Sequence, residues 1–91
     1  MAIERREAYY RGHVQGVGFR FRTCRVATHF AVVGFVENLS DGRVHLIAEG
    51  ERSELDRFLE EIQQTLGNHI RETMVDRQVA TNEFLEFGIR R

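Results

Sequence analysis

The stretch VVGFVENLSDGRVHLIAE, residues 32–49, contains two runs rich in β-branched and aromatic residues on either side of a turn. The first run, VVGFVEN, and the alternating second run, RVHLIAE, each have the composition of a strand. Ser40, Asp41 and Gly42 between them are residue types that favour tight turns. This stretch therefore predicts a β-hairpin in the middle of the chain.

An amphipathic helix is predicted on each side of this hairpin. In the downstream helix, Ser53 and Asp56 have the spacing of a capping box, and Gly67 supplies a natural stop. Apolar residues recur at helical spacing on both sides. They are Phe19, Thr23, Val26, Ala27 and Phe30 upstream, and Leu55, Phe58, Leu59, Ile62 and Leu66 downstream.

Further strands are predicted towards both ends of the chain. REAYYRGHV (6–14) places Ala8 and Tyr10 on one face and Tyr9 on the other, until Gly12 interrupts the pattern. MVDRQVAT (74–81) and FLEFGIRR (84–91) complete the set, and they join near Thr81, Asn82 and Glu83. The order β-α-β-β-α-β, with a short C-terminal strand, predicts an α+β, ferredoxin-like split βαβ fold. Its two helices would pack on one face of an antiparallel sheet.

Length and composition limit the possible functions. A chain of 91 residues is expected to form one domain, residues 1–91, and to be a monomer. A formal net charge of -1 supplies no overall field for nucleic acid or an anionic membrane. The chain has a single cysteine, no apolar signal-peptide core near its N-terminus and no membrane-spanning run. These features predict a reducing, cytoplasmic compartment.

The segment GHVQGVGFR, residues 12–20, lies between the first predicted strand and the first predicted helix. Backbone N–H groups at a helix N-terminus lack intrahelical partners and suit an anion. Gly16 and Gly18 allow several of these groups to turn towards one phosphate-sized concavity, and Arg20 can add a two-pronged hydrogen bond. The other interpretation is a simple tight turn followed by a solvated arginine, and spacing alone does not decide between them.

The sequence argues more clearly against the common nucleotide-binding motifs and against a metal site. Phe21 occupies the third glycine position of a G-x-G-x-x-G motif, and no glycine-lysine-serine or glycine-lysine-threonine sequence occurs, so neither a Rossmann nor a Walker site is supported. The histidines are scattered, and with one cysteine no metal site is expected. They are His13, which is expected to face solvent, and His29, His45 and His69. Cys24 is expected to be a small packing residue.

Two separated motifs make the chain similar to the acylphosphatase family. They are GHVQGVGFR (12–20) and GFVENLSDGRVHLIAEG (34–50), and the similarity continues through SELDRFLEEI, VDRQV and FLEFGIR. The resemblance implies the ferredoxin-like fold. It also implies hydrolysis of the carboxyl-phosphate bond of small acyl phosphates, with no metal or other cofactor.

The same resemblance assigns roles to residues. It implies that Arg20 and Asn38 are catalytic, the arginine holding phosphate and the asparagine orienting the attacking water. Thr23 is expected to pack beneath the loop, where its hydroxyl can brace Arg20 or the backbone. The phosphate cradle implied by the resemblance comprises Gln15, Gly16, Val17, Gly18, Phe19 and Arg20.

Two departures from the common family pattern lie near Asn38. Glu37 occupies a position that is often basic, where a carboxylate aimed at the site would weaken phosphate binding. Strand alternation predicts that Glu37 points away from Asn38. Phe35 replaces a more usual tryptophan or tyrosine, so the ring is kept and its polar group is lost.

Two other classes of function stay open at this point. A noncatalytic domain of the same fold could bind a phosphorylated metabolite and regulate a partner, although the presence of both Arg20 and Asn38 favours catalysis. A nucleic-acid-binding module could use Tyr9 and Tyr10 on the sheet together with Arg5 and Arg6. The net charge and the missing RNA-binding aromatic signature argue against that module.

Overall fold

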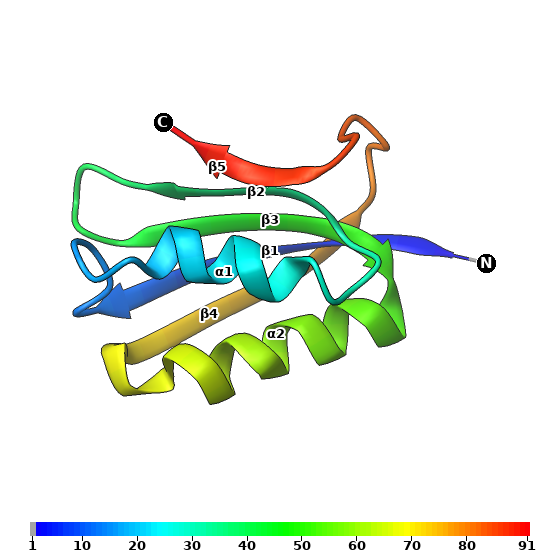
Figure 1. Cartoon of the computed structure of the whole chain (residues 1–91). Coiled ribbons are helices and arrows are strands. Elements are labelled where there is room, and N and C mark those ends of the chain that lie inside the picture. Colours follow the sequence, from blue (N-terminus) through cyan, green and yellow to red (C-terminus); the bar gives the residue numbers. More distant parts are fainter. Residues whose placement is uncertain (1) are drawn as a thin grey trace.

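The computed structural model describes residues 2–91 and contains one five-stranded sheet with strand order β4-β1-β3-β2-β5. Both helices lie on the same face of this sheet (Figure 1). The predicted βαββαβ order with an added strand is confirmed. The elements are β1 (Ile3–Gly12), α1 (Phe19–Ala27), β2 (Val33–Asn38), β3 (Val44–Glu51), α2 (Arg52–Leu66), the short 3₁₀ helix η1 (Gly67–His69), β4 (Ile70–Val79) and β5 (Phe87–Arg90).

The core lies between the sheet and the two helices. Ala8 and Tyr10 of β1 point into it, as the alternation predicts, and the Tyr10 ring centroid is 5.3 Å from that of Phe19 in α1. Both predicted apolar stripes are present, with Leu59 only partly buried. Phe30 lies beyond the end of α1 and packs against Phe58 of α2. The buried members of the stripes are Phe19, Thr23, Val26 and Ala27 in α1, and Leu55, Phe58, Ile62 and Leu66 in α2.

The sheet is not wholly antiparallel as predicted, because β5 runs parallel to β2. The path of the chain explains this direction. β4 ends beside the start of β1, where Val79 pairs with Glu4, and β2 also begins at that end of the sheet. A segment that crosses from that end of the sheet to the free edge of β2 must then run in the same direction as β2 (Figure 1).

The predicted capping box at the start of α2 is wrong. The helix begins at Arg52, and the residue before it, Glu51, is extended and makes no capping hydrogen bond. Glu51 still pairs with Ile3 in the sheet, so β3 passes into α2 without a loop in which Ser53 could act as the N-cap. Asp56 instead accepts a hydrogen bond from Arg6, at 2.8 Å. The predicted stop at Gly67 is confirmed, and η1 follows directly.

The last two strands differ from their predicted bounds. β4 begins at Ile70, four residues before the prediction, and β5 covers only Phe87–Arg90. β4 is an edge strand whose side chains after Ile70 are exposed on both faces, so its sequence carries no alternation from which the start could be found. No helix in residues 2–91 is long and apolar enough to cross a membrane.

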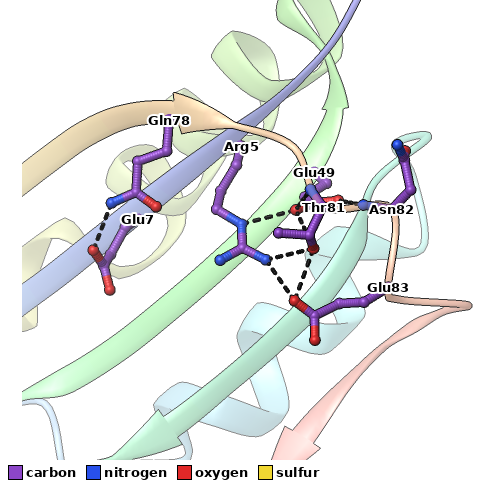
Figure 2. Close-up of polar contacts among 7 residues, drawn as sticks. All are labelled: Arg5, Glu7, Glu49, Gln78, Thr81, Asn82 and Glu83. Carbon is purple, nitrogen blue, oxygen red and sulfur yellow. Dashed lines mark hydrogen bonds and ion pairs between the residues drawn. The ribbon is translucent and has the colours of Figure 1, made fainter.

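A buried carboxylate fixes the segment that leads into β5. Glu49 of β3 is 1% exposed and accepts hydrogen bonds from Arg5 Nε at 2.8 Å and from the backbone N–H groups of Thr81 at 2.9 Å and Asn82 at 3.0 Å (Figure 2). Thr81 Oγ1 donates another, at 3.2 Å. Desolvation raises the pKa of Glu49, but the hydrogen bonds from these donors outweigh it, so the pKa lies below its ordinary value.

Replacing Glu49 with glutamine is expected to destabilise the protein by about 2 kcal/mol at pH 7, because an amide cannot accept from all four donors. Since the pKa of Glu49 is lower in the folded than in the unfolded state, the stabilisation is present above an ordinary pKa of 4.5 and is lost as the pH falls through the folded value. Urea unfolding from pH 7 to pH 3 measures this difference. Glu60→Gln, at an exposed position of α2, is the control. If the free energies of unfolding of Glu49→Gln and the parent differ by the same amount from pH 7 to pH 3, the role assigned to the Glu49 carboxylate is wrong.

Candidate active site

The loop between β1 and α1 has the backbone geometry that its glycines predict. Gly16 and Gly18 have φ angles of 80° and 78°, in the left-handed region that favours glycine. Gly18 is the N-cap of α1, and its carbonyl accepts the first helical hydrogen bond from Arg22 N–H, at 2.9 Å. The positive φ angles turn the chain sharply just before the helix, so the loop and the first turn of α1 form one concave surface.

The N–H groups along this surface are free to bind a ligand. Those of residues 16–20 donate to no other group in residues 2–91. Unpaired N–H groups at a helix N-terminus carry partial positive charge and bind anions well. The Arg20 side chain stands in the first turn of α1 and makes no ion pair within the same residues. The loop therefore presents several donors and one uncompensated positive charge.

Asn38 reaches the same place from the end of β2. The hairpin turn that follows is built as predicted, with a hydrogen bond from Gly42 N–H to the Leu39 carbonyl at 3.1 Å and a φ of 94° at Gly42. Asn38 Oδ1 is buried and accepts no hydrogen bond from any group in residues 2–91. A buried acceptor without a partner is costly, so this oxygen is suited to a water molecule or ligand beside it.

Arg20 and Asn38 meet at one cavity of about 150 Å³. A larger cavity, of about 510 Å³, lies between α1 and α2 and contains none of the predicted site residues. Within residues 2–91, no carboxylate side chain lines the smaller cavity. Its lining residues are Val14, Gly16, Gly18, Phe19, Arg20, Phe21, Asn38, Ile89 and Arg91.

The side chain of Gln15 connects the loop to the turn between β2 and β3. It does not line the cavity, and its side-chain amide donates to the carbonyls of Leu39 and Arg43, at 2.8 and 3.0 Å. These bonds tie the loop to the β2–β3 turn. Arg20 and Asn38, which belong to different elements, are thereby held in a fixed relation by the side chain of Gln15, a residue that the family resemblance places in the phosphate cradle.

Val17 and Thr23 also lie outside the cavity lining. Val17 is partly buried and packs against the core. Thr23 is fully buried in α1, and its hydroxyl has no hydrogen-bond partner in residues 2–91. The structure therefore contains no bond from Thr23 to Arg20 or to the loop backbone.

Four lining residues were missed by sequence reasoning: Val14, Phe21, Ile89 and Arg91. Phe21 directly follows Arg20 in the first turn of α1, and this adjacency was an available signal. Ile89 and Arg91 reach the cavity only because β5 runs parallel to β2, with Ile89 opposite Val36 and Arg90 opposite Glu37. No pattern in the sequence indicated that pairing.

Glu37 points away from Asn38, as the alternation predicts. On the face of the sheet opposite the helices, Glu37 Oε2 lies 2.7 Å from Nδ1 of His45, whose Nε2 lies 2.8 Å from Glu7 Oε2. Gln78 donates to the other oxygen of Glu7, at 2.8 Å (Figure 2). The hydrogen bonds with His45, then with Gln78, outweigh desolvation and lower the pKa of Glu7. Glu37 is thus engaged away from the cavity and brings no negative charge to it.

His13 and Cys24 were also considered for a chemical role, and both lie where a residue without such a role was expected. His13 is exposed. Cys24 is partly buried and packs against the core, and burial raises the pKa of its thiol, which disfavours the nucleophilic thiolate. Within residues 2–91, no three His, Cys, Asp or Glu side chains are grouped so that they could hold a metal ion.

Comparison with known proteins agrees with this geometry. The family model described as acylphosphatase matches residues 6–89. The chain belongs to the acylphosphatase family. A curated acylphosphatase from Archaeoglobus fulgidus is 55% identical over 53 residues, which are 58% of this chain and 60% of that protein. The chain thus spans about 60% of the length of the first curated acylphosphatases that it matches.

Solved structures extend the similarity over the whole fold. The crystal structure of an acylphosphatase from Bacillus subtilis superposes with a TM-score of 0.86 at 28% identity, covering 97% of this chain and 99% of that one. Full-length HypF, solved in a phosphate- and nucleotide-bound form, matches with a TM-score of 0.83 at 32% identity over 97% of this chain but only 12% of its own. The acylphosphatase fold therefore occurs both in a chain of this size and as a small part of a longer one.

Proposed function

We propose that this protein is an acylphosphatase, a hydrolase that converts small acyl phosphates to a carboxylate and inorganic phosphate. The observation that carries the proposal is the meeting of Arg20, Asn38 and the unpaired loop N–H groups at one cavity. An acyl phosphate is a mixed anhydride with a good leaving group. Positioning of water and stabilisation of phosphoryl charge can therefore suffice for catalysis.

In this proposal the loop and Arg20 hold the phosphate. The N–H groups of residues 16–20 donate to its oxygens, and the guanidinium of Arg20 can donate two parallel hydrogen bonds. The glycines at 16 and 18 matter because the backbone must come close to the anion in a conformation that other residues resist. The hydrogen bonds of Gln15 to the hairpin turn keep this cradle at a constant distance from Asn38.

Asn38 orients the water in the same scheme. Its unpaired Oδ1 accepts a hydrogen bond from the water, whose oxygen attacks phosphorus. The bond between phosphorus and the acyl oxygen breaks, and its electron pair leaves with the carboxylate. Since an amide cannot take up a proton at neutral pH, the water proton passes to an oxygen of the substrate phosphate. No strong protein base is needed.

Replacing Asn38 with alanine is expected to lower kcat for benzoyl phosphate by up to about a hundredfold with little change in KM, because the water loses its orientation while the phosphate contacts remain. Loss of the anhydride is followed with a metal chelator present throughout. Asn68→Ala, at an exposed position in η1, is the matched control and should retain full activity. Equal activity of Asn38→Ala and the parent would contradict the role of this amide.

The same assay tests the proposed function itself. A parent protein no faster than buffer would refute the enzyme assignment. Binding of inorganic phosphate to that inactive protein would then favour the noncatalytic alternative, a domain that recognises a phosphorylated metabolite.

Four less specific assignments accompany this function. We infer that residues 1–91 act as one domain and as a monomer, because the proposed site is built from a single copy of the chain. The single cysteine supports a reducing compartment such as the cytoplasm. A net charge of -1 argues against nucleic acid as a partner. Salt-dependent binding to a polynucleotide would overturn that last inference.

A further inference from the structure

The cavity has walls that the phosphate does not use. The cradle occupies one side of it, formed by the loop and the first residues of α1. Phe21, Ile89 and Arg91 also line it, and none of them belongs to the cradle. If the phosphate binds as proposed above, we expect the attached acyl group to lie against these side chains, which can then distinguish one acyl group from another.

Phe21 offers free apolar surface at this place. It is 61% exposed, although it stands next to the proposed phosphate ligand Arg20. The guanidinium carbon of Arg25 lies 6.0 Å from the centroid of its ring. A guanidinium on one face of a ring leaves the other face and the edge available, so Phe21 has an uncovered aromatic surface at the cavity.

Ile89 extends the same surface from β5. It packs partly against the core, which fixes its position, and its remaining surface faces the cavity. Ile89 lies opposite Val36 in the β2–β5 ladder, two residues before Asn38. The apolar wall is therefore held by the strand pairing that also places the end of β2.

We propose, on the basis of the function proposed above, that Phe21 and Ile89 bind the acyl group of the substrate and that Phe21 selects aromatic acyl groups. Aromatic rings gain more from contact with another ring than their buried area alone supplies. Small aliphatic acyl groups are too short to cover the Phe21 ring and gain little from it. Arg91 lines the same region and offers the competing possibility, recognition of acyl groups that carry their own negative charge.

Three probe substrates separate these possibilities: benzoyl, acetyl and succinyl phosphate. The parent protein is expected to have a kcat/KM for benzoyl phosphate about threefold to tenfold above that for acetyl phosphate. Phe21→Ala should remove this preference by raising KM for benzoyl phosphate alone. Phe21→Tyr, which keeps the ring, should preserve it. Phe21 lies on the helix surface and alanine favours helices, so the substitution should leave the fold intact.

Leu85→Ala is the matched control, because Leu85 is 96% exposed and does not line the cavity. It should leave the ratio of benzoyl to acetyl phosphate turnover unchanged. If the protein hydrolyses acetyl phosphate but Phe21→Ala does not change the ratio of benzoyl to acetyl phosphate turnover, this inference is overturned. The proposed function would still stand. A preference for succinyl phosphate that Arg91→Gln abolishes and Phe21→Ala does not would also overturn it. Failure to hydrolyse any of the three would refute the proposed function instead.

Discussion

Alanine in place of Arg20 is expected to lower kcat/KM for acyl phosphate hydrolysis by at least about a hundredfold while the protein stays folded. Arg20 is the only charged side chain that lines the cavity from α1, and it makes no ion pair within residues 2–91. Its charge is therefore uncompensated and available to the phosphoryl group. Since no group in residues 2–91 loses an ion pair with Arg20, the free energy of unfolding should change little.

Comparison with lysine tests the geometry of this group as well as its charge. Arg20→Lys keeps the positive charge but cannot donate two parallel hydrogen bonds, so its activity should lie between those of the parent and Arg20→Ala. Arg22→Ala removes the same charge two residues later, where the side chain donates to the carbonyl of Thr65, and serves as the control. Rates with benzoyl phosphate and competitive inhibition by inorganic phosphate are the measurements. Similar activity of Arg20→Ala and Arg22→Ala would reject the assignment of Arg20 to the phosphate.

The largest expected effect on stability comes from replacing Gly34 with alanine. Gly34 lies in β2 with a φ of 143°, a conformation that side chains rarely allow. A Cβ atom there would clash with the backbone carbonyl oxygen of Ile47 in β3. Its N–H also donates to the carbonyl of Glu86, at 3.0 Å, so the chain cannot shift without weakening the attachment of β5. We expect a loss of more than about 3 kcal/mol in the free energy of unfolding.

Urea unfolding of Gly34→Ala, followed by circular dichroism, measures this loss. Gly88→Ala is the matched control, because a Cβ at Gly88 in the neighbouring strand β5 would meet nothing within 4 Å. The free energy of unfolding of that variant should be within about 0.5 kcal/mol of the parent value. Equal stability of the two variants would show that β2 and β3 can separate to admit a methyl group.

Local patterns were sufficient to predict the helices, the hairpin and the conformation of the glycine loop. The apolar stripe of α2 could be recognised because its exposed positions are polar and its buried ones are not. Gly16 and Gly18 indicated their own backbone conformation, since few other residues adopt positive φ at low cost. The placement of Arg20 and Asn38 at one cavity needed the resemblance to a known family as well, because the start of a helix and the end of the following strand carry no local pattern that brings them together.

The features that could not be predicted depend on contacts between distant segments. The amide of Gln15 is chemically suited to a phosphate or to a carbonyl, and only the position of the hairpin turn decides in favour of the carbonyls of Leu39 and Arg43. The start of β4 was missed because an exposed edge strand has no buried face to impose alternation. Ile89 and Arg91 were missed because they reach the cavity through the parallel pairing of β5.

The parallel pairing of β5 also determines at which stage of synthesis and folding the cavity can form. Arg20 and Asn38 are synthesised before Ile89 and Arg91, because they precede them in the sequence. The hairpin and α1 can assemble first, but the cavity keeps an open side until the chain has crossed the end of the sheet and β5 has docked beside β2. A nascent chain that lacks this strand holds the proposed catalytic pair without the wall that confines a substrate.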